Sequence, residues 1–264
     1  MTDAADELRV VIDRVAARED LGAHRSSYAA AKPGTRRYVI EGVGTLCAGL
    51  LTAIGCLTGA AVVVIVGVTA VLMVGGRLLW DLLWVAYVRG RNRHVRLDLY
   101  ERGLVVTVGG AARCVRYDTT TLRRTIVEHA DSPAPSQVSH TYSLVDTVGA
   151  PIVLRHGIAQ PQQWGPEIDR AITAAQLPLA SRVLAAGGCV DFEYFWMTQA
   201  EIGAGERSEP WSLVSGIDVR HGWVSVEVSG GGRTLESLPV SLIPNFTVFR
   251  TLAERMRAEH AHVS

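Results

Sequence analysis

The strongest pattern along the chain is a run of about fifty mostly apolar positions at residues 39–88. A helix needs roughly 20 apolar residues to cross the ~30 Å hydrocarbon core of a bilayer. The run is therefore too long for one crossing and has the length of two. Gly55 and Gly59 interrupt it near its middle, and its only charged residues are Glu41, Arg77 and Asp81. This pattern predicts a transmembrane helical hairpin.

We predict spans at about 39–56 and 58–79, joined by a tight turn at 55–59. Aromatic residues follow the second span, and such residues are typical of the headgroup region. The second helix is therefore expected to continue to residue 88 as an interfacial stem carrying Trp80, Trp84 and Tyr87. The alternative is a hairpin buried inside a soluble protein. It would need more surrounding protein than 264 residues supply, because both helices are apolar all round.

Basic residues flank the apolar run on both sides. Before it stand Arg25, Lys32, Arg36 and Arg37, and after it stand Arg89, Arg91, Arg93 and Arg96. Positive residues near membrane spans stay on the cytoplasmic side. We therefore predict a multi-pass protein of the cell inner membrane or cytoplasmic membrane, with both termini and the soluble region in the cytoplasm. The four arginines after the run are candidate contacts with the membrane surface.

The charged residues inside the apolar run are expected to hold the hairpin together. Counted from the predicted turn, Glu41 and Arg77 lie within about 6 Å of the same depth at ~1.5 Å rise per residue. Asp81 follows Arg77 by four positions, which places both on one helix face. We predict an Arg77–Glu41 or Arg77–Asp81 pair as a structural clasp and not as an ion path. Small residues along both helices favour close packing of their backbones.

Residues 1–38 are predicted to form a cytoplasmic amphipathic helix and a linker. Within 3–19, apolar and charged residues fall on opposite sides of a helix, the apolar ones being Leu8, Val11, Ile12 and Val15. The mixed charge of the polar side is not typical of a lipid-binding helix. Packing against the soluble region, or loose solvation, is the favoured interpretation. Pro33 and Gly34 mark the linker into the hairpin.

From residue 94 the pattern changes to short strand-like runs separated by turn residues. Six such runs and a helix at 161–175 define a first β unit at 93–176. A similar order follows at 177–264 and ends in a helix from about 245 to 259, whose apolar face carries Phe246, Phe249, Leu252, Ala253 and Met256. Two local matches favour a duplication: 97–100 with 190–193, and Tyr117 with Trp211.

Composition and motifs exclude several function classes. The net charge is zero and the pI is near neutral, so nothing favours nucleic acid as a partner. The four cysteines lack C-x-x-C spacing, and only His260 and His262 cluster among the histidines, so neither a zinc site nor another cofactor is expected. Nucleophile motifs such as G-x-S-x-G are absent. We expect no catalytic residues, no cofactor and no enzymatic activity.

A small antiparallel β unit closed by one amphipathic helix resembles the pleckstrin-homology-like (PH-like) architecture. The chain resembles uncharacterised bacterial membrane proteins of the actinobacterial type, which combine a two-helix hairpin with PH-like domains. The resemblance covers about 27–258 and is carried by the residues at 99–104, 211–217 and 243–246. It implies an α+β membrane protein in which a transmembrane hairpin precedes tandem PH-like antiparallel β units, each closed by an α-helix.

Three functions remain open on these observations. The first is a membrane-anchored cytoplasmic binding or scaffold protein without catalytic activity, whose partners are the lipid bilayer and a protein of unknown identity. The second is an accessory subunit of a membrane complex that assembles through its hairpin. The third is an enzyme of unknown reaction, which would require a pocket that gathers ionisable groups from distant segments.

Overall fold

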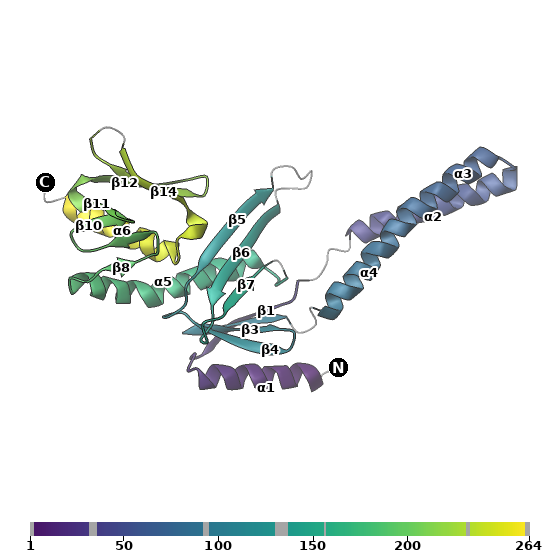
Figure 1. The fold of residues 1–264 in the computed structure, drawn as a ribbon. Helices are drawn as coiled ribbons and strands as arrows, with labels where there is room; N and C mark the ends of the chain where they lie inside the picture. The colour runs from purple at the N-terminus through teal and green to yellow at the C-terminus, as the bar shows by residue number, and fades with distance from the viewer. Residues whose placement is uncertain are drawn as a thin grey trace. The chain divides into compact units, whose positions relative to one another are not determined.

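A computed structural model describes residues 3–31, 36–91, 95–129, 137–155, 157–230 and 233–261. The chain divides into two compact units (Figure 1). Met1–Ala29 and Val95–Ser264 form one, here called the β-rich unit, and Ala30–His94 forms the other, here called the hairpin unit. The hairpin is therefore an insertion within the β-rich unit. The prediction placed residues 1–38 in a separate segment ahead of the hairpin, whereas residues 1–29 belong to the β-rich unit.

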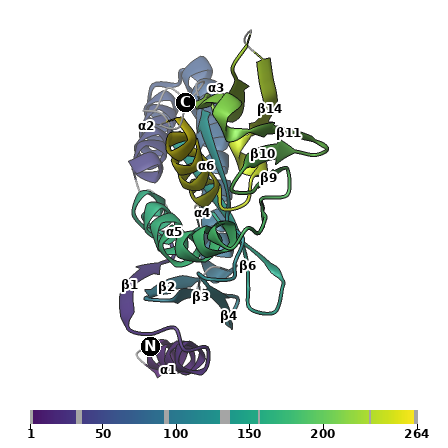
Figure 2. The ribbon, with the colours of Figure 1, turned by 90° about the vertical axis from the view of Figure 1, so that its left-hand side faces the viewer.

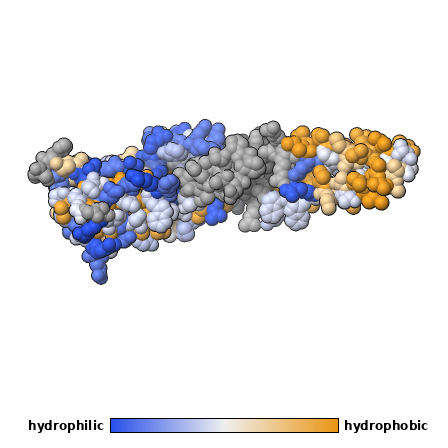
Figure 3. Space-filling model, turned by 90° about the horizontal axis from the view of Figure 1, so that it is seen from above, coloured by the Kyte–Doolittle hydropathy of each residue, from blue (hydrophilic) through white to orange (hydrophobic). Residues whose placement is uncertain are grey.

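The hairpin unit consists of helices α2 (Arg36–Thr58), α3 (Ala61–Ala70) and α4 (Gly76–Arg91), with a π-helical turn at Val71–Gly75 between the last two. Two stretches, Val39–Thr58 and Ala61–Tyr87, are long and apolar enough to cross a membrane by length and composition. Figure 3 shows hydrophobic residues covering much of this unit. The predicted helical continuation through the aromatic stem is confirmed, because α4 extends to Arg91.

The turn of the hairpin lies at Gly59 and Ala60, later than predicted, and Gly59 adopts the left-handed conformation with φ +69°. Gly55 lies inside α2 instead, at a close helix contact. A Cβ on Gly55 would stand 2.9 Å from the backbone nitrogen of Val64, and one on Gly67 would stand 2.9 Å from that of Thr52. The expected role of small residues in close helix packing is confirmed at Gly67, and Gly55, which was predicted in the turn, has the same role.

The first half of the β-rich unit contains two antiparallel sheets. One has the order β1-β2-β3-β4 and the other β5-β6-β7. The strands are β1 (His24–Ala29), β2 (Arg96–Tyr100), β3 (Gly103–Val108), β4 (Ala111–Arg116), β5 (Arg123–His129), β6 (Gln137–Val145) and β7 (Pro151–Leu154). Helix α5 (Pro161–Ala185) follows. Strand β1 was not predicted from the sequence, because His24–Ala29 is mostly polar and lies before the hairpin.

The second half repeats this layout. A four-stranded sheet has the order β11-β10-β9-β8, a three-stranded sheet has the order β12-β13-β14, and a closing helix follows. The elements are β8 (Val190–Asp191), β9 (Phe195–Met197), β10 (Glu201–Ala204), β11 (Arg207–Pro210), β12 (Val214–Arg220), β13 (Trp223–Val228), β14 (Arg233–Pro239) and α6 (Phe246–Ala261). The five apolar residues predicted on the last helix are all buried, which confirms that face of α6.

Each half has its own hydrophobic core, and α5 contributes to both. Trp164, Ile168 and Ile172 pack in the first core, whereas Leu184 packs in the second. The predicted boundary between residues 176 and 177 therefore falls inside one continuous helix. At a rise of 1.5 Å per residue, the two ends of a helix of this length lie far enough apart to pack in different cores.

Of the two local matches that predicted an internal repeat, the structure supports the aromatic pair. The other match compares strands that are not equivalent. Tyr117 and Trp211 each follow the fourth strand of their half and are each 1% exposed. Their backbone N–H groups donate to Arg102 and Ala200, which lie in the equivalent turns. The match of 97–100 with 190–193 is wrong by one strand, because it pairs β2 with β8. Because β1 was not recognised, β2 was taken as the first strand of its half and was matched with β8 instead of β9.

Helix α1 (Asp3–Arg18) covers the outer face of the first four-stranded sheet, on the side away from α5 (Figure 2). Ile12 and Ala16 pack there against Tyr100, Val105 and Cys114. Of the two favoured interpretations, packing and loose solvation, the structure confirms packing, here against the β-rich unit. The amino-terminal segment therefore belongs to the β-rich unit and is not a free element ahead of the hairpin.

Candidate binding cleft at the root of the hairpin insertion

A polar cleft lies where β1 and β2 pair, on the sheet face that α1 covers. The pairing places Ser27 opposite Asp98 and Ala29 opposite Arg96. The two strands therefore hold together the chain segments that lead into and out of the hairpin. The cleft has a volume of about 280 Å³, and its walls come from α1, β1 and β2: Arg9, Ile12, Asp13, His24, Ser27, Arg96 and Asp98.

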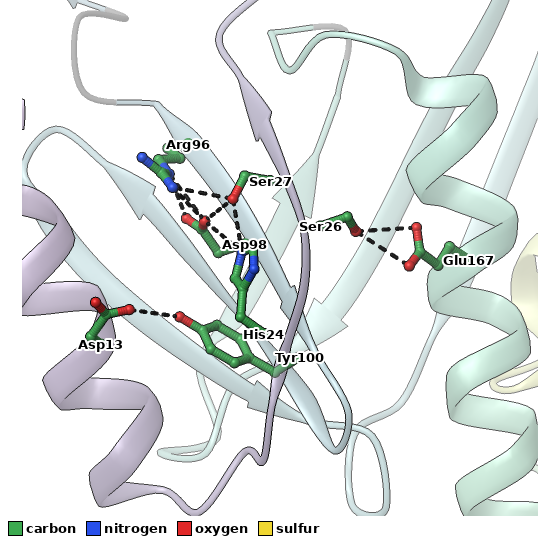
Figure 4. Close-up of polar contacts among 8 residues, drawn as sticks. All are labelled: Asp13, His24, Ser26, Ser27, Arg96, Asp98, Tyr100 and Glu167. Atoms are coloured by element: carbon green, nitrogen blue, oxygen red, sulfur yellow. Dashed lines mark hydrogen bonds and ion pairs between the residues drawn. The ribbon is translucent and has the colours of Figure 1, made fainter.

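Asp98 is the centre of this cleft (Figure 4). It is 1% exposed, although it carries a carboxylate. Arg96 binds both of its oxygens, with Nε 2.8 Å from Oδ2 and a terminal nitrogen 2.8 Å from Oδ1. Ser27 Oγ donates to Oδ1 at 2.5 Å. A two-pronged guanidinium contact plus a hydroxyl donor compensates a buried carboxylate, so the charge is stable in this position.

His24 stands beside this pair but does not complete a catalytic triad. Its Nε2 lies 2.8 Å from Ser27 Oγ and 3.4 Å from Asp98 Oδ1. Serine nucleophiles need a histidine that contacts the serine with one nitrogen and the carboxylate with the other. Here one nitrogen faces both groups, and the serine donates directly to the carboxylate. The arrangement suits binding and strand locking, and it does not activate Ser27 as a nucleophile.

The electrostatics of the cleft keep Arg96 charged and Tyr100 neutral. The hydrogen bond to Asp98 raises the pKa of Arg96 above its usual range. Burial, with the charges of Asp98 and Asp13, raises the pKa of Tyr100 to about 12. The Tyr100 hydroxyl therefore remains a donor at neutral pH, and it points to Asp13 Oδ1 at 3.5 Å. The cleft therefore offers a ligand the guanidinium of Arg96, the imidazole of His24 and the carboxylate of Asp13 on α1.

Other side chains of β1 point the opposite way and tie the strand to α5. Ser26 Oγ lies 3.3 Å from both carboxylate oxygens of Glu167 (Figure 4), and the Tyr28 hydroxyl donates to the same group at 3.0 Å. Burial raises the pKa of Tyr28, which keeps that hydroxyl protonated. Strand β1 is thus fixed on one face by Asp98 and on the other by Glu167.

The structure places the predicted site residues in different surroundings. Arg77 Nε lies 3.7 Å from Glu41 Oε1, so these two are brought together, and Asp81 stands one turn further along α4. Arg96 is engaged by Asp98 in the cleft, with its side chain 32% exposed. Arg89 and Arg91 lie in α4, but their side chains, like the whole of Arg93, are outside the described part of the chain.

Asp98, Ser27 and His24 were not predicted as a group from the sequence. One local signal was present, because Asp98 interrupts an otherwise apolar strand between Leu97 and Leu99. Its partner Ser27 is 71 positions away, however, and lies between the predicted helix at 3–19 and the hairpin, where no strand was predicted. Within the described residues, no group of three His, Cys, Asp or Glu side chains could hold a metal ion.

Comparison with known proteins assigns a family and no activity. No curated protein and no solved structure matches the chain. One family model covers residues 4–262, which includes both the hairpin unit and the two β-rich halves. The chain therefore belongs to the family of unknown function DUF6585.

Proposed function

We propose that the protein is a membrane-anchored cytoplasmic scaffold without catalytic activity. Its hairpin would sit in the inner or cytoplasmic membrane, and its two β-rich halves would act as PH-like units that hold a protein segment or contact the inner leaflet. The PH-like assignment is supported by the layout of each half, in which a four-stranded sheet, a three-stranded sheet and a helix follow in order.

One observation carries the proposal. The hairpin unit is inserted between β1 and β2, two neighbouring strands whose pairing is locked by Ser27, Arg96 and Asp98. An anchor attached by one flexible linker would leave the soluble part free to diffuse around it. Both chain connections to the hairpin leave the β-rich unit at neighbouring, paired strands, which favours a scaffold attached to its anchor at two points.

The location is tested by fractionation and reporter fusions. Membranes from expressing cells, washed with alkaline carbonate, should retain the full chain. Reporters placed at Thr35 and after Asn92 should report cytoplasm, and an insertion at Gly59 should report the opposite side. Release of the chain by carbonate, or a non-cytoplasmic readout after Asn92, would refute the anchor.

The binding role is tested by photo-crosslinking in native membranes. Probes on exposed β-rich positions, Trp223 and Tyr194, should capture a protein or lipid, whereas the buried position Phe195 serves as the matched control. An accessory-subunit role is the second candidate. It is favoured by Gly49 and Ala53, which are exposed one turn apart on α2 and would allow another helix to approach. Capture only through probes near these two residues would favour that role.

A further inference from the structure

The two halves of the β-rich unit meet through polar contacts. Their hydrophobic cores share no residue among those that the structure describes. Helix α5 runs through both halves, and the segment just ahead of α6 lies against the segment just ahead of β5. Domains that meet through a small polar interface generally move relative to each other, whereas a large apolar interface fixes them. The arrangement of the halves therefore depends on these polar contacts.

Asn245 is the centre of the contact. Its side-chain Oδ1 accepts a hydrogen bond from the backbone N–H of Leu122 at 2.7 Å, and its own backbone N–H donates to the Leu122 carbonyl at 2.8 Å. Its Nδ2 donates to Gln176 Oε1 at 2.7 Å and to the Thr120 carbonyl at 3.3 Å. Both polar atoms of the Asn245 amide are therefore used across the contact.

Helix α5 adds two further bonds to the contact. Gln176 Nε2 donates to the backbone carbonyls of Tyr117 at 2.8 Å and Thr120 at 2.7 Å. Near the start of α6, Thr247 Oγ1 donates to the carboxylate of Asp169 on α5 at 2.8 Å. The first turn of α6 is thus joined to α5 and to the loop between β4 and β5.

The amide of Asn245 serves this contact and not its own helix. An asparagine just ahead of a helix commonly accepts a hydrogen bond from an N–H of the first helical turn. Here the helix starts from the backbone carbonyl of Asn245, which accepts from Val248 at 2.8 Å and Phe249 at 3.1 Å. Asn245 also adopts φ +50°, a left-handed conformation that asparagine tolerates better than most residues. The conformation at this position aims the amide at the first half.

Helix α5 has a weak point beside the contact. Pro178 lies inside α5, between Ala175, which packs against the first core, and Leu184, which packs in the second. Proline has no backbone N–H, so the carbonyl of Ala174 lacks its helical partner. Sharp helix kinks occur mostly at such positions. Gln176, which binds Asn245, is only two residues away.

We propose that the two halves form a hinged pair, in which α5 bends at Pro178 and a latch holds the pair closed. The latch consists of Asn245 and Gln176 with their hydrogen bonds to residues 117–122. It uses side-chain amides and backbone groups, whose hydrogen bonds water can replace, so it can open without disrupting either core. The hinge concerns the β-rich unit alone and is independent of the proposed membrane anchor.

Distances between two spin labels test the latch on the full chain in detergent. The labels are placed at Val148→Cys in the first half and Glu206→Cys in the second, both exposed positions. The other accessible cysteines are replaced by serine: Cys47, Cys56 and Cys189. The intact latch should give one distance. Asn245→Gly should add a second population, because glycine tolerates φ +50° but lacks the amide.

Gln176→Ala breaks the latch from the other side and should produce the same second population. Amide exchange at Leu122 should become about tenfold faster in Asn245→Gly, as expected for the loss of one hydrogen bond. Thr251→Ala is the matched control, because it removes a hydrogen bond within α6 only. A second population in the intact chain or in this control, or none in the two latch variants, would overturn the proposal.

The hinge is tested in the opened chain. Adding Pro178→Ala to Asn245→Gly should reduce the second population, because alanine restores the helical hydrogen bond to Ala174 and stiffens α5. Pro166→Ala, a matched change nearer the start of the same helix, should leave that population unchanged. Equal effects of the two proline changes, or no effect of Pro178→Ala, would overturn the hinge at this position.

Discussion

The two halves of the β-rich unit share one layout but close it by different means. In the first half, Arg113 of β4 binds Asp146, whose side chain is 4% exposed, and the carbonyl of Ala150 at 2.9 Å. In the second half, the equivalent closure uses exposed pairs such as Arg207–Glu236, whose arginine is 62% exposed. Solvent screens exposed pairs, whereas a buried charge depends strongly on its partner. The first half therefore relies on a few specific polar contacts more than the second.

The outer faces of the two four-stranded sheets differ in the same sense. In the first half, α1 covers this face with an apolar side. In the second half, the indole of Trp196 lies over Gly203 and donates to the carbonyl of Gly205 at 3.1 Å. The half that carries the inserted hairpin is thus the one reinforced by an extra helix and by the Asp98 cluster. This reinforcement lies in the half whose strands β1 and β2 flank the insertion.

The separateness of the two cores gives the largest expected effect. Trp164→Ala removes the largest side chain of the first core, and Phe249→Ala removes a fully buried ring of the second. Each should lower the free energy of unfolding by about 3–5 kcal/mol. Hydrogen exchange of the full chain should lose protection first in the half that carries the change. Identical exchange patterns in the two variants would mean one undivided core, and the exposed Arg250→Ala is the neutral control.

The Asp98 cluster should come next in magnitude. Asp98→Ala leaves Arg96 without its main partner in a partly buried position, which should cost about 3 kcal/mol. Amide protection should fall along β1 and β2, where the chain enters and leaves the hairpin. Glu236→Gln, which removes an exposed pair in the second half, should cost less than about 1 kcal/mol. Equal losses from the two changes would contradict the contrast between the halves.

The closure at Asp146 should make the first half sensitive to acid. Burial acts to raise the pKa of Asp146, but hydrogen bonds from Arg113, Ala150 and Val148 outweigh it and hold the pKa below its usual range. A lowered folded pKa means that this stabilisation is complete above the ordinary carboxyl pKa of about 4 and is lost as pH falls through the folded value. Asp146→Asn should cost about 2 kcal/mol at pH 7.

The measurement for this third prediction is the free energy of unfolding between pH 6 and pH 2. The Asp146→Asn variant should show a shallower fall than the wild type over the acid part of that range. A curve parallel to that of the wild type would show that Asp146 contributes no pH-dependent stability, whatever its burial.

The hairpin clasp should give the smallest effect. Arg77→Leu removes the ion pair with Glu41 and should lower hairpin stability by about 1 kcal/mol in a membrane. Adding Glu41→Gln and Asp81→Asn should recover part of the loss, because no charge then remains unbalanced at that depth. Steric trapping in bicelles measures this, with the exposed Leu72→Ala as control. A triple variant no better than Arg77→Leu would show that the charges are not coupled.

Local features of the sequence predicted the helices well. The length and apolar character of residues 39–88 define two helices because both properties belong to a contiguous stretch of chain. The same holds for α1 and α6, where helical spacing of apolar residues identified the buried faces around Ile12 and Phe249. Tyr117 and Trp211 were matched correctly, because each is a large aromatic residue that lies a few positions before a strand.

Tertiary structure alone decided the pairing of distant segments. Strand β1 is recognisable only through its partner β2, which lies beyond the hairpin, and Asp98 becomes a buried site only when Ser27 arrives from 71 positions away. Gly55 serves close packing in place of a turn because Val64 of the next helix approaches it. The helical spacing of apolar residues is a property of one contiguous stretch of chain, whereas strand pairing and the burial of a charge depend on contacts between residues far apart in the sequence.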